Sequence, residues 1–275
     1  MILDMKDFQE FEKDRLKKNV ESLKNLGITT KLIILTDDED KRTQSYMKSK
    51  LVMADELGIK ATKCVVKNET EATKAILNAI FHNTPIICQL PINKNILDLY
   101  NSKLELLSDV DGFNSLDYVF KDNYSNIPAT PKGIMRHLSY IKYNLRGKTV
   151  VILGRGELVG KPLATLMINK GASVVVLNSK SNKQVREQIL KLADVVICAT
   201  GIKGSAKVSE LSPDKEVLVY NVGTCFENGK LTTELEVDED KVNVKYTDRI
   251  KAVGVCTVLE LMDNVVNHYE NMLVK

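Results

Sequence analysis

The sequence predicts an α/β protein of two domains, each with a parallel sheet between helices. Short apolar runs alternate with longer amphipathic segments along most of the 275 residues. The apolar runs lack polar alternation, which is typical of strands buried on both faces of a parallel sheet. The alternation stops between residues 108 and 131, where prolines and small polar residues predict a domain boundary. We expect a ligand cleft between the two domains.

Composition restricts the class of protein. With 44% hydrophobic and 27% charged residues, the chain has the make-up of a globular protein that buries a core. It has no run of about 18 apolar residues that would span a membrane, and its charged N-terminus lacks the pattern of a secretory signal. The net charge of +3 is too small and scattered to predict nucleic-acid binding. We expect a cytoplasmic protein with a small-molecule partner, and neither nucleic acid nor membrane.

The cysteines and histidines predict neither disulfides nor a metal site. The five cysteines form no C-x-x-C pair, and three lie in apolar runs, where a thiol behaves as a small buried hydrophobe. The three histidines lie far apart in the sequence, without metal-ligand spacing. We therefore expect reduced thiols and no metal.

The first domain is predicted to begin with a helix, because apolar residues recur at near-helical spacing from Phe8 to Leu26 and Gly27 then ends the segment. Strands and helices alternate after it. The predicted strands are 31–36, 62–66 and 85–90, and the predicted helices are 42–57, 69–82 and 95–107.

The second domain is predicted to repeat this alternation. The final segment places its apolar residues on one helical face. The predicted strands are 149–153, 173–177, 194–200 and 217–222, and the predicted helices are 132–145, one from about residue 161, one between 178 and 194, and 258–273.

The stretch GRGELVGKP, from Gly154 to Pro162, follows a predicted strand. Pro162 suits the first turn of a helix, where its missing N–H costs nothing. Glycine at 154 and 156 lets the backbone turn sharply and approach phosphate oxygens. A tight turn without a ligand is the alternative, but a glycine turn between strand and helix favours a nucleotide pyrophosphate. We therefore interpret the second domain as a Rossmann-like NAD(P)-binding domain.

The next strand indicates which nucleotide is bound. NAD-binding domains place Asp or Glu about 20 residues after the glycines, on the ribose 2′-hydroxyl. Here the strand ends in Asn178-Ser179-Lys180-Ser181, with no acid. Ser179 can donate to a 2′-phosphate, and Arg155 or Lys180 can pair with it, which favours NADP over NAD. The ends of two further strands, 199–201 and 221–224, are expected to line the ribose and the nicotinamide.

The first domain carries a second group of candidate residues. Tyr46 and Lys50 lie four residues apart, on one face of a predicted helix. A lysine beside apolar packing can act as a base, whereas the alternative is a lysine that extends over the tyrosine ring. Gln89 ends a predicted strand. Asp111 lies in an irregular loop, where polar residues are often functional, although an Asp before Gly also suits a simple turn.

Several motifs occur here in the order and separations of a known family. They are S-Y-x-x-x-K, Q-L-P, D-V-D-G-F, P-x-T-P-x-G, G-R-x-x-x-V-G-x-P and a degenerate V-G-x-x-T. Over nearly its whole length the chain resembles the bifunctional methylenetetrahydrofolate dehydrogenase/methenyltetrahydrofolate cyclohydrolase family. The resemblance implies an enzyme of one-carbon metabolism and purine biosynthesis, usually a homodimer. It would oxidise methylenetetrahydrofolate with NADP, or with NAD, and hydrolyse the methenyl product to 10-formyltetrahydrofolate.

The resemblance also implies a division of the chain. Residues 1–130 with 255–275 would form the folate-binding catalytic domain, because the last helix of the family returns to the first domain. Residues 131–254 would form the NAD(P)-binding domain, with the folate in the cleft.

The same resemblance implies roles for individual residues. Lys50 matches the catalytic lysine, Gln89 its hydrogen-bonding partner, Tyr46 the residue that packs over the pterin, and Asp111 the carboxylate that anchors the pterin amino group. Leu90 and Thr257 complete the implied substrate-binding residues. The cofactor-binding residues are Gly154, Arg155, Gly156, Val159, Gly160, Ser179, Lys180, Gly201 and Thr224.

The chain departs from the family pattern at four places. Ala129 replaces the cysteine of P-C-T-P, Gly156 replaces the serine of G-R-S, residues 37–41 replace a D-P-A-S loop, and residues 248–252 replace a loop rich in proline and glycine. Three alternatives therefore stay open: a divergent member with one of the two activities, a non-catalytic folate- or nucleotide-binding protein, and a shikimate-type two-domain dehydrogenase. The last has no need of Q-L-P or D-V-D-G-F.

Overall fold

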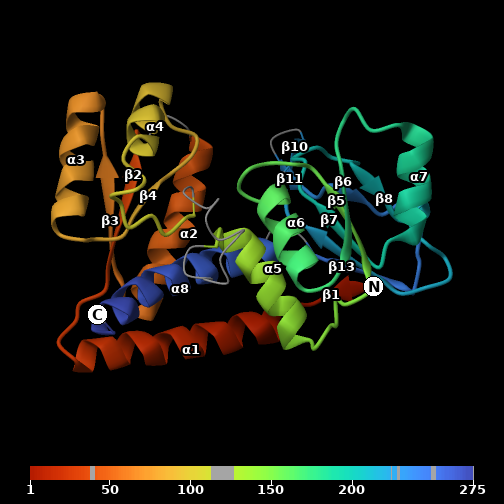
Figure 1. The fold of residues 1–275 in the computed structure, drawn as a ribbon, viewed down its shortest axis with the longest axis horizontal. Helices are drawn as coiled ribbons and strands as arrows, with labels where there is room; N and C mark the ends of the chain where they lie inside the picture. The colour runs from red at the N-terminus through yellow and green to blue at the C-terminus, as the bar shows by residue number, and fades with distance from the viewer. Residues whose placement is uncertain (38–40, 113–126, 224, 228–229, 249–251, 275) are drawn as a thin grey trace. The chain divides into compact units, whose positions relative to one another are not determined.

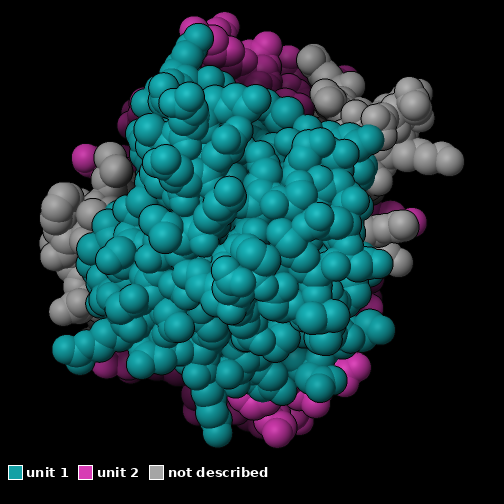
Figure 2. Space-filling view, turned by 90° about the vertical axis from the view of Figure 1, so that its right-hand side faces the viewer, with its two compact units in different colours: residues 1–9, 130–257 teal, residues 10–129, 258–275 magenta. Residues whose placement is uncertain are grey.

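The computed structural model divides the chain into two compact units (Figure 2). Unit 1 comprises residues 1–9 and 130–257, and unit 2 comprises residues 10–129 and 258–275. The sequence placed the first nine residues in the other domain, but strand β1 pairs in parallel with β13 of unit 1. The residues that the structure describes are 1–37, 41–112, 127–223, 225–227, 230–248 and 252–274.

Unit 1 contains a six-stranded sheet in the order β1–β13–β9–β7–β5–β6, with every neighbouring pair parallel (Figure 1). The three central strands β9, β7 and β5 are buried, as their unbroken apolar runs predict. The strands are β1 (Ile2–Leu3), β5 (Thr149–Leu153), β6 (Ser173–Leu177), β7 (Val195–Cys198), β9 (Val217–Asn221) and β13 (Val244–Thr247).

Helices cover both faces of this sheet (Figure 1). Alternate residues of β5 enter two separate cores: Val150 packs in the cluster that contains α5 and α6, and Val151 in the cluster that contains α7. The remaining elements are α5 (Ala129–Tyr140), α6 (Gly160–Asn169), α7 (Lys183–Leu192), η3 (Val208–Glu210), and the short strands β8 (Ala206–Lys207), β10 (Cys225–Glu227), β11 (Lys230–Thr232) and β12 (Leu235–Glu236).

Helix α5 ends five residues before the predicted end at residue 145. Lys142 has a left-handed φ of 55°, which a continuing α-helix does not allow. Leu145 is nevertheless buried, so the apolar pattern that suggested a longer helix reflects packing of the following turn.

Unit 2 contains a three-stranded parallel sheet in the order β3–β2–β4. Strand β3 is an edge strand with mostly exposed or half-buried side chains, although its sequence suggested a buried strand. The elements are α1 (Lys6–Asn25), β2 (Lys31–Thr36), α2 (Lys41–Leu57), β3 (Lys60–Val65), α3 (Glu69–Phe81), β4 (Ile86–Cys88), α4 (Lys94–Asn101) and α8 (Val253–Leu273). Helices α1 and α8 each begin in unit 1 and continue into unit 2.

Helix α4 stops at Asn101, although the sequence predicted a helix to residue 107. Turns follow it, and Leu104 and Leu107 still pack against the core of α3, α4, β2 and β4. The helical spacing of the apolar residues therefore comes from successive turns that cover the same core.

The part of α8 in unit 2 is fixed by polar contacts as well as by apolar ones. Asp263 forms an ion pair with Arg15 of α1. The Asn264 amide donates to the carbonyls of Val110 at 2.9 Å and Ile127 at 3.1 Å. The Tyr269 hydroxyl accepts from the backbone N–H of Lys31 at the start of β2. This segment therefore belongs to unit 2 although it is the last part of the chain.

The five cysteines are free, and four of them are buried. Of the helices described, none combines the length and the apolar character that a transmembrane segment requires.

A buried histidine–tyrosine pair lies in the core of unit 1. The His137 Nδ1 atom is 2.7 Å from the Tyr220 hydroxyl, and both side chains are almost completely buried. The rings of Phe8 and Tyr220 meet the imidazole edge-on. Burial lowers the pKa of His137 to about 4, because the charged form loses its hydration in this apolar surrounding.

This pair predicts a pH-dependent loss of stability. The folded pKa of His137, about 4, lies below the unfolded value near 6.5, so the unfolded chain binds more protons between these pH values. The stabilising contribution is complete above about pH 6.5 and is lost as the pH falls towards 4, by up to about 3 kcal/mol. Urea unfolding at pH 7 and pH 4.5 measures it, and His137→Gln is expected to flatten the decline.

Substitution of the exposed His82 by Gln provides the matched control, and it should leave the decline unchanged. If wild type and His137→Gln lose equal free energy of unfolding between the two pH values, this reading of His137 is wrong.

Candidate active site

Helix α2 brings Lys50 close to Asp111. The Lys50 ammonium nitrogen lies 4.0 Å from Asp111 Oδ2, and the side chains are 12% and 23% exposed. Tyr46 lies one turn earlier on the same helix, with 38% of its surface exposed. The structure thus brings together the lysine and the aspartate that the sequence singled out. At this distance the two groups attract each other while a ligand atom can still reach both.

Gln89 follows the end of β4 and is 7% exposed. Its amide nitrogen donates to the Leu90 carbonyl at 2.9 Å, and the peptide bond from Leu90 to Pro91 is cis. The Gln89 Oε1 atom is buried and has no hydrogen-bond partner among the described residues. A buried acceptor without a donor is uncommon in folded proteins and calls for an explanation.

Sequence reasoning missed the residues that hold the Asp111 loop. Buried Asp109 accepts from the Asp111 backbone N–H at 3.2 Å and lies 3.4 Å from the Tyr100 hydroxyl. Tyr100 donates to the Ile86 carbonyl, which links this loop to β4. Asn264 of α8 binds the carbonyl between the two aspartates. The only signal for these positions was the repeated Asp of D-V-D, which marks a polar loop but not its partners.

The pKa of the Cys88 thiol is sensitive to the charged residues around it. Burial, and after it the negative charges of Asp111, Asp37 and Asp109, raise the pKa of its thiol to about 12, while the positive charge of Lys50 lowers it. The thiol is therefore neutral near pH 7 and acts as a packing group. The carboxylates near it make this end of the sheet favourable for a positive charge or for N–H donors.

The glycine loop of unit 1 is shaped by two close backbone contacts. Gly154 has a left-handed φ of 109°, and a Cβ there would lie 2.2 Å from the Ala199 carbonyl oxygen. A Cβ at Gly160, the first residue of α6, would lie 2.2 Å from the Gly154 carbonyl oxygen. Gly156 has open space around its Cβ position and no left-handed φ. The structure thus requires glycine at 154 and 160, whereas the sequence analysis predicted this requirement at 154 and 156.

The other residues of the loop range from exposed to buried. Arg155 is exposed, and Val159 is the N-cap residue of α6. Lys161 forms an ion pair with Glu157 one turn earlier. Pro162 lies in the first turn of α6, as its missing N–H predicts.

The turn after β6 presents two of the predicted cofactor residues to solvent. Asn178 Oδ1 accepts from the Lys180 backbone N–H at 2.8 Å, and Ser181 Oγ accepts from the Asn178 backbone N–H at 3.0 Å. These two bonds fix the turn from within. The side chains of Ser179 and Lys180 are exposed, in a turn that carries no acid.

The ends of β7 and β9 are held by buried polar groups. Gly201 has a left-handed φ of 71° and is exposed. Asn221 was expected to line the nucleotide site, but its side chain is buried and bonds the backbone of Thr247 and Leu235. Thr224 lies outside the described residues.

Thr257 belongs to unit 1, whereas Lys50 and Asp111 belong to unit 2. The Thr257 hydroxyl lies 2.9 Å from the hydroxyl of Thr130, and both residues belong to unit 1. The structure thus joins the P-x-T-P and V-G-x-x-T motifs to each other. Of the departures from the family pattern, Ala129 and Gly156 are described, and most of the stretches at 37–41 and 248–252 lie outside the described residues.

Comparison with known proteins identifies relatives of the whole chain. Residues 128–273 match the family model for the tetrahydrofolate dehydrogenase/cyclohydrolase NAD(P)-binding domain. Bifunctional protein FolD of Staphylococcus epidermidis is 31% identical over 276 residues, which cover 96% of this chain and 94% of the relative.

Solved structures give the same picture. The bifunctional methylenetetrahydrofolate dehydrogenase/cyclohydrolase of Campylobacter jejuni is 28% identical, with a TM-score of 0.87 and 99% of each chain covered. The enzyme of Trypanosoma brucei, solved with NADP and an inhibitor, is 22% identical with a TM-score of 0.87, over 100% of this chain and 99% of that one. The second similarity shows the fold alone.

Proposed function

Because this chain belongs to the tetrahydrofolate dehydrogenase/cyclohydrolase family, we propose that it catalyses both reactions of that name. It oxidises methylenetetrahydrofolate to methenyltetrahydrofolate with NADP and hydrolyses the methenyl compound to 10-formyltetrahydrofolate. The observation that carries the proposal is the group formed by Lys50, Asp111 and the unpartnered Gln89 Oε1. A shikimate-type reaction needs neither this lysine–glutamine–aspartate group nor the motifs that supply it.

The dehydrogenase step moves a hydride from the methylene carbon to the cofactor and leaves a methenyl cation. The nicotinamide supplies the hydride acceptor, so the protein's part is to hold the two reactants in contact geometry. Asp111 binds the pterin amino group, the buried Gln89 Oε1 accepts an N–H from the substrate, and Tyr46 packs beside the ring. The acidic surroundings of Lys50 favour the cationic product.

The cyclohydrolase step adds water to the methenyl carbon. One water proton is lost as the new C–O bond forms. The resulting hydroxyl loses its proton as the C=O bond forms, the C–N bond breaks and the released nitrogen gains a proton, so one proton is released overall. Lys50 is the group placed to move that proton, with Asp111 4.0 Å away to orient its ammonium. Gln89 lies at the end of the neighbouring strand, where its amide fixes the Leu90 carbonyl.

The residues of unit 1 fit a dinucleotide. Gly154 and Gly160 let the loop after β5 pack closely against the end of β7 and the start of α6, which leads the glycine turn directly into the N-terminus of a helix, the arrangement that binds a pyrophosphate. Ser179 and Lys180 are exposed on the next strand end, in place of an acid, and Arg155 is exposed on the loop. These groups favour the 2′-phosphate of NADP, with NAD as the weaker substrate. Val159, Gly156, Gly201 and Thr224 complete the proposed cofactor contacts.

The activity assay distinguishes the proposal from its alternatives. Methenyl formation is followed by absorbance with NADP and with NAD, and its hydrolysis is followed without cofactor. Both activities are expected, and the dehydrogenase should prefer NADP. Hydrolysis without oxidation would indicate a divergent member, and ligand binding with neither reaction would indicate a non-catalytic protein.

The 2′-phosphate contact gives a separate prediction. In Ser179→Asp, a carboxylate next to the phosphate should raise the KM for NADP by about 10- to 100-fold, because like charges in contact cost several kcal/mol and each 1.4 kcal/mol is about tenfold. The KM for NAD should change by less than about threefold. Initial rates with each cofactor measure the difference.

Ser173→Asp, at the exposed opposite end of β6, should leave both KM values unchanged. Equal losses for NADP and NAD in Ser179→Asp would contradict a phosphate contact at this turn.

Three further features belong to the proposal. Residues 10–129 with 258–275 act as the folate-binding part, and residues 1–9 with 130–257 act as the NAD(P)-binding part. The family resemblance favours a homodimer in the cytoplasm that serves one-carbon metabolism and purine biosynthesis. Sedimentation of the purified protein tests the dimer.

A further inference from the structure

Glu234 lies directly before β12, and its side chain is completely buried. Its Oε2 atom accepts from the backbone N–H of Thr200 at 3.0 Å, from the Thr200 hydroxyl at 3.1 Å and from the Ser205 hydroxyl at 3.1 Å. Its Oε1 atom accepts from the backbone N–H of Gly201 at 2.5 Å. One carboxylate therefore collects four donors from the loop that follows β7.

The same carboxylate lies against the loop that follows β9. A Cβ at Gly223 would lie 1.5 Å from Glu234 Oε1 and 2.8 Å from the Gly201 nitrogen. Glycine at 223 is thus required by the position of Glu234. The carboxylate fills the space between the ends of two adjacent parallel strands, and one of those ends is followed by Gly201, which the sequence assigned to the cofactor.

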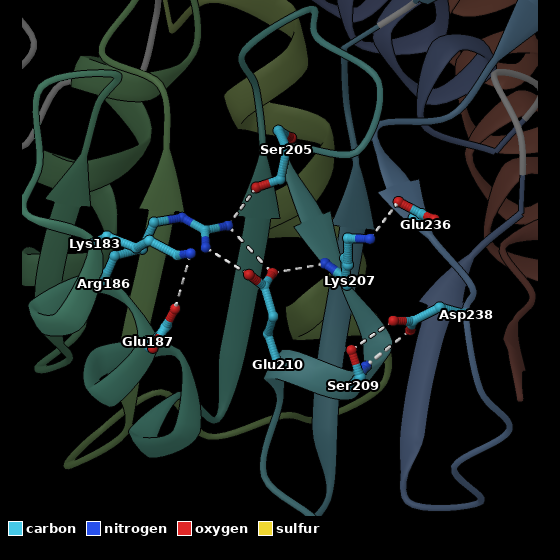
Figure 3. A network of polar contacts seen from close by, with 9 residues as sticks. All are labelled: Lys183, Arg186, Glu187, Ser205, Lys207, Ser209, Glu210, Glu236 and Asp238. Carbon is cyan, nitrogen blue, oxygen red and sulfur yellow. Dashed lines mark hydrogen bonds and ion pairs between the residues drawn. The ribbon is translucent and has the colours of Figure 1, made fainter.

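The Ser205 end of the β7 loop is also bound by helix α7 (Figure 3). Arg186 of α7 donates to the Ser205 carbonyl at 2.6 Å and to Glu210 at 2.7 Å. Glu210 also accepts from the backbone N–H of Lys207 at 2.8 Å. Glu234 therefore binds both ends of residues 200–205, and Arg186 adds a second contact at Ser205.

Burial of a carboxylate costs free energy unless hydrogen bonds or an ion pair compensate for the lost hydration. Among the described residues no ion pair involves Glu234, so its charge is stabilised by N–H and O–H donors alone. After burial, this charge is the next cause that raises the pKa of the Cys198 and Cys225 thiols. Replacement by Gln would leave one amide N–H₂ facing backbone or hydroxyl donors, so Gln cannot satisfy both sides of this site.

We propose that Glu234 is a positioning residue of the dehydrogenase reaction, which sets the separation of the loops after β7 and β9 against the ribose and nicotinamide of the cofactor. The inference rests on the proposed function. It predicts that Glu234 governs cofactor binding and hydride transfer, and has no part in the hydrolysis of the methenyl compound, which uses the residues of unit 2.

The test compares both reactions in Glu234→Gln. The KM for NADP should rise at least about tenfold and the dehydrogenase kcat should fall, while hydrolysis without cofactor stays within about twofold of wild type. Glu234→Asp keeps the charge but is shorter, so it should restore part of the NADP affinity. If Glu234→Gln does not fold, the NADP affinity of Glu234→Asp tests the proposal instead. The control Glu236→Gln removes only the exposed ion pair with Lys207 and should change neither reaction.

Titration of NADPH fluorescence measures the same affinity change without turnover. Absence of both reactions in the wild-type protein would contradict the proposed function, while the NADPH titration would still test Glu234. An unchanged NADPH affinity in Glu234→Gln, or equal losses in both reactions, would overturn the inference.

Discussion

Lys50→Met is expected to lower the rate of methenyltetrahydrofolate hydrolysis by about 10²- to 10⁴-fold, the usual contribution of a general acid–base group. The side chain is only 12% exposed and lies 4.0 Å from Asp111. Methionine keeps the length and the apolar stem, which separates the loss of the amine from a loss of packing. Decay of methenyl absorbance without cofactor measures the rate.

Lys48→Met is the matched control, because Lys48 lies on the same helix with an exposed side chain. It should hydrolyse the substrate at the wild-type rate. A Lys50→Met enzyme that retains more than about a tenth of that rate would remove Lys50 from its proposed role.

The second large effect is expected from Gly154→Ala. The new Cβ would lie 2.2 Å from the Ala199 carbonyl in a residue with a φ of 109°, so either the loop after β5 or the end of β7 must move. We expect dehydrogenase activity and NADPH affinity to fall by more than about 100-fold, since misplacement by about 1 Å already costs that much. Initial dehydrogenase rates and NADPH fluorescence measure the loss.

Gly156→Ala in the same loop provides the comparison. Its Cβ position is open and its backbone is not left-handed, so the loss should be far smaller than in Gly154→Ala. Thermal unfolding of both variants shows whether a loss in rate follows a loss of fold. Similar dehydrogenase rates in the two variants would contradict the steric argument.

Much of the fold could be predicted from local pattern. Strands β5, β7 and β9 are central in a parallel sheet, and burial on both faces produces unbroken apolar runs that are visible in the sequence. Strands β1, β8 and β12 have two residues each, too few to show any period, and their pairing is set by distant partners. The exposed strand β3 has apolar residues like the others, so its edge position depended on sheet order alone.

The candidate site was predictable only in part for a related reason. Lys50 and Asp111 carry recognisable chemistry in recognisable motifs, so residue type and context found them. Asp109, Asn264 and Glu234 act through hydrogen bonds to backbone groups from remote parts of the chain. Such partners leave no local pattern, because an acid or amide that binds a distant loop resembles an ordinary surface residue in the sequence.

The chain order of unit 2 has a consequence for synthesis on the ribosome. The part of α8 from residue 258 onward, held by Arg15, Lys31 and the Val110 carbonyl, is translated only after all of unit 1. Residues 10–129 therefore emerge without the segment that covers them and must wait for it, whereas unit 1 needs only its first nine residues and its own continuous stretch. A nascent chain stalled before residue 258 should show protease resistance in unit 1 and cleavage within unit 2.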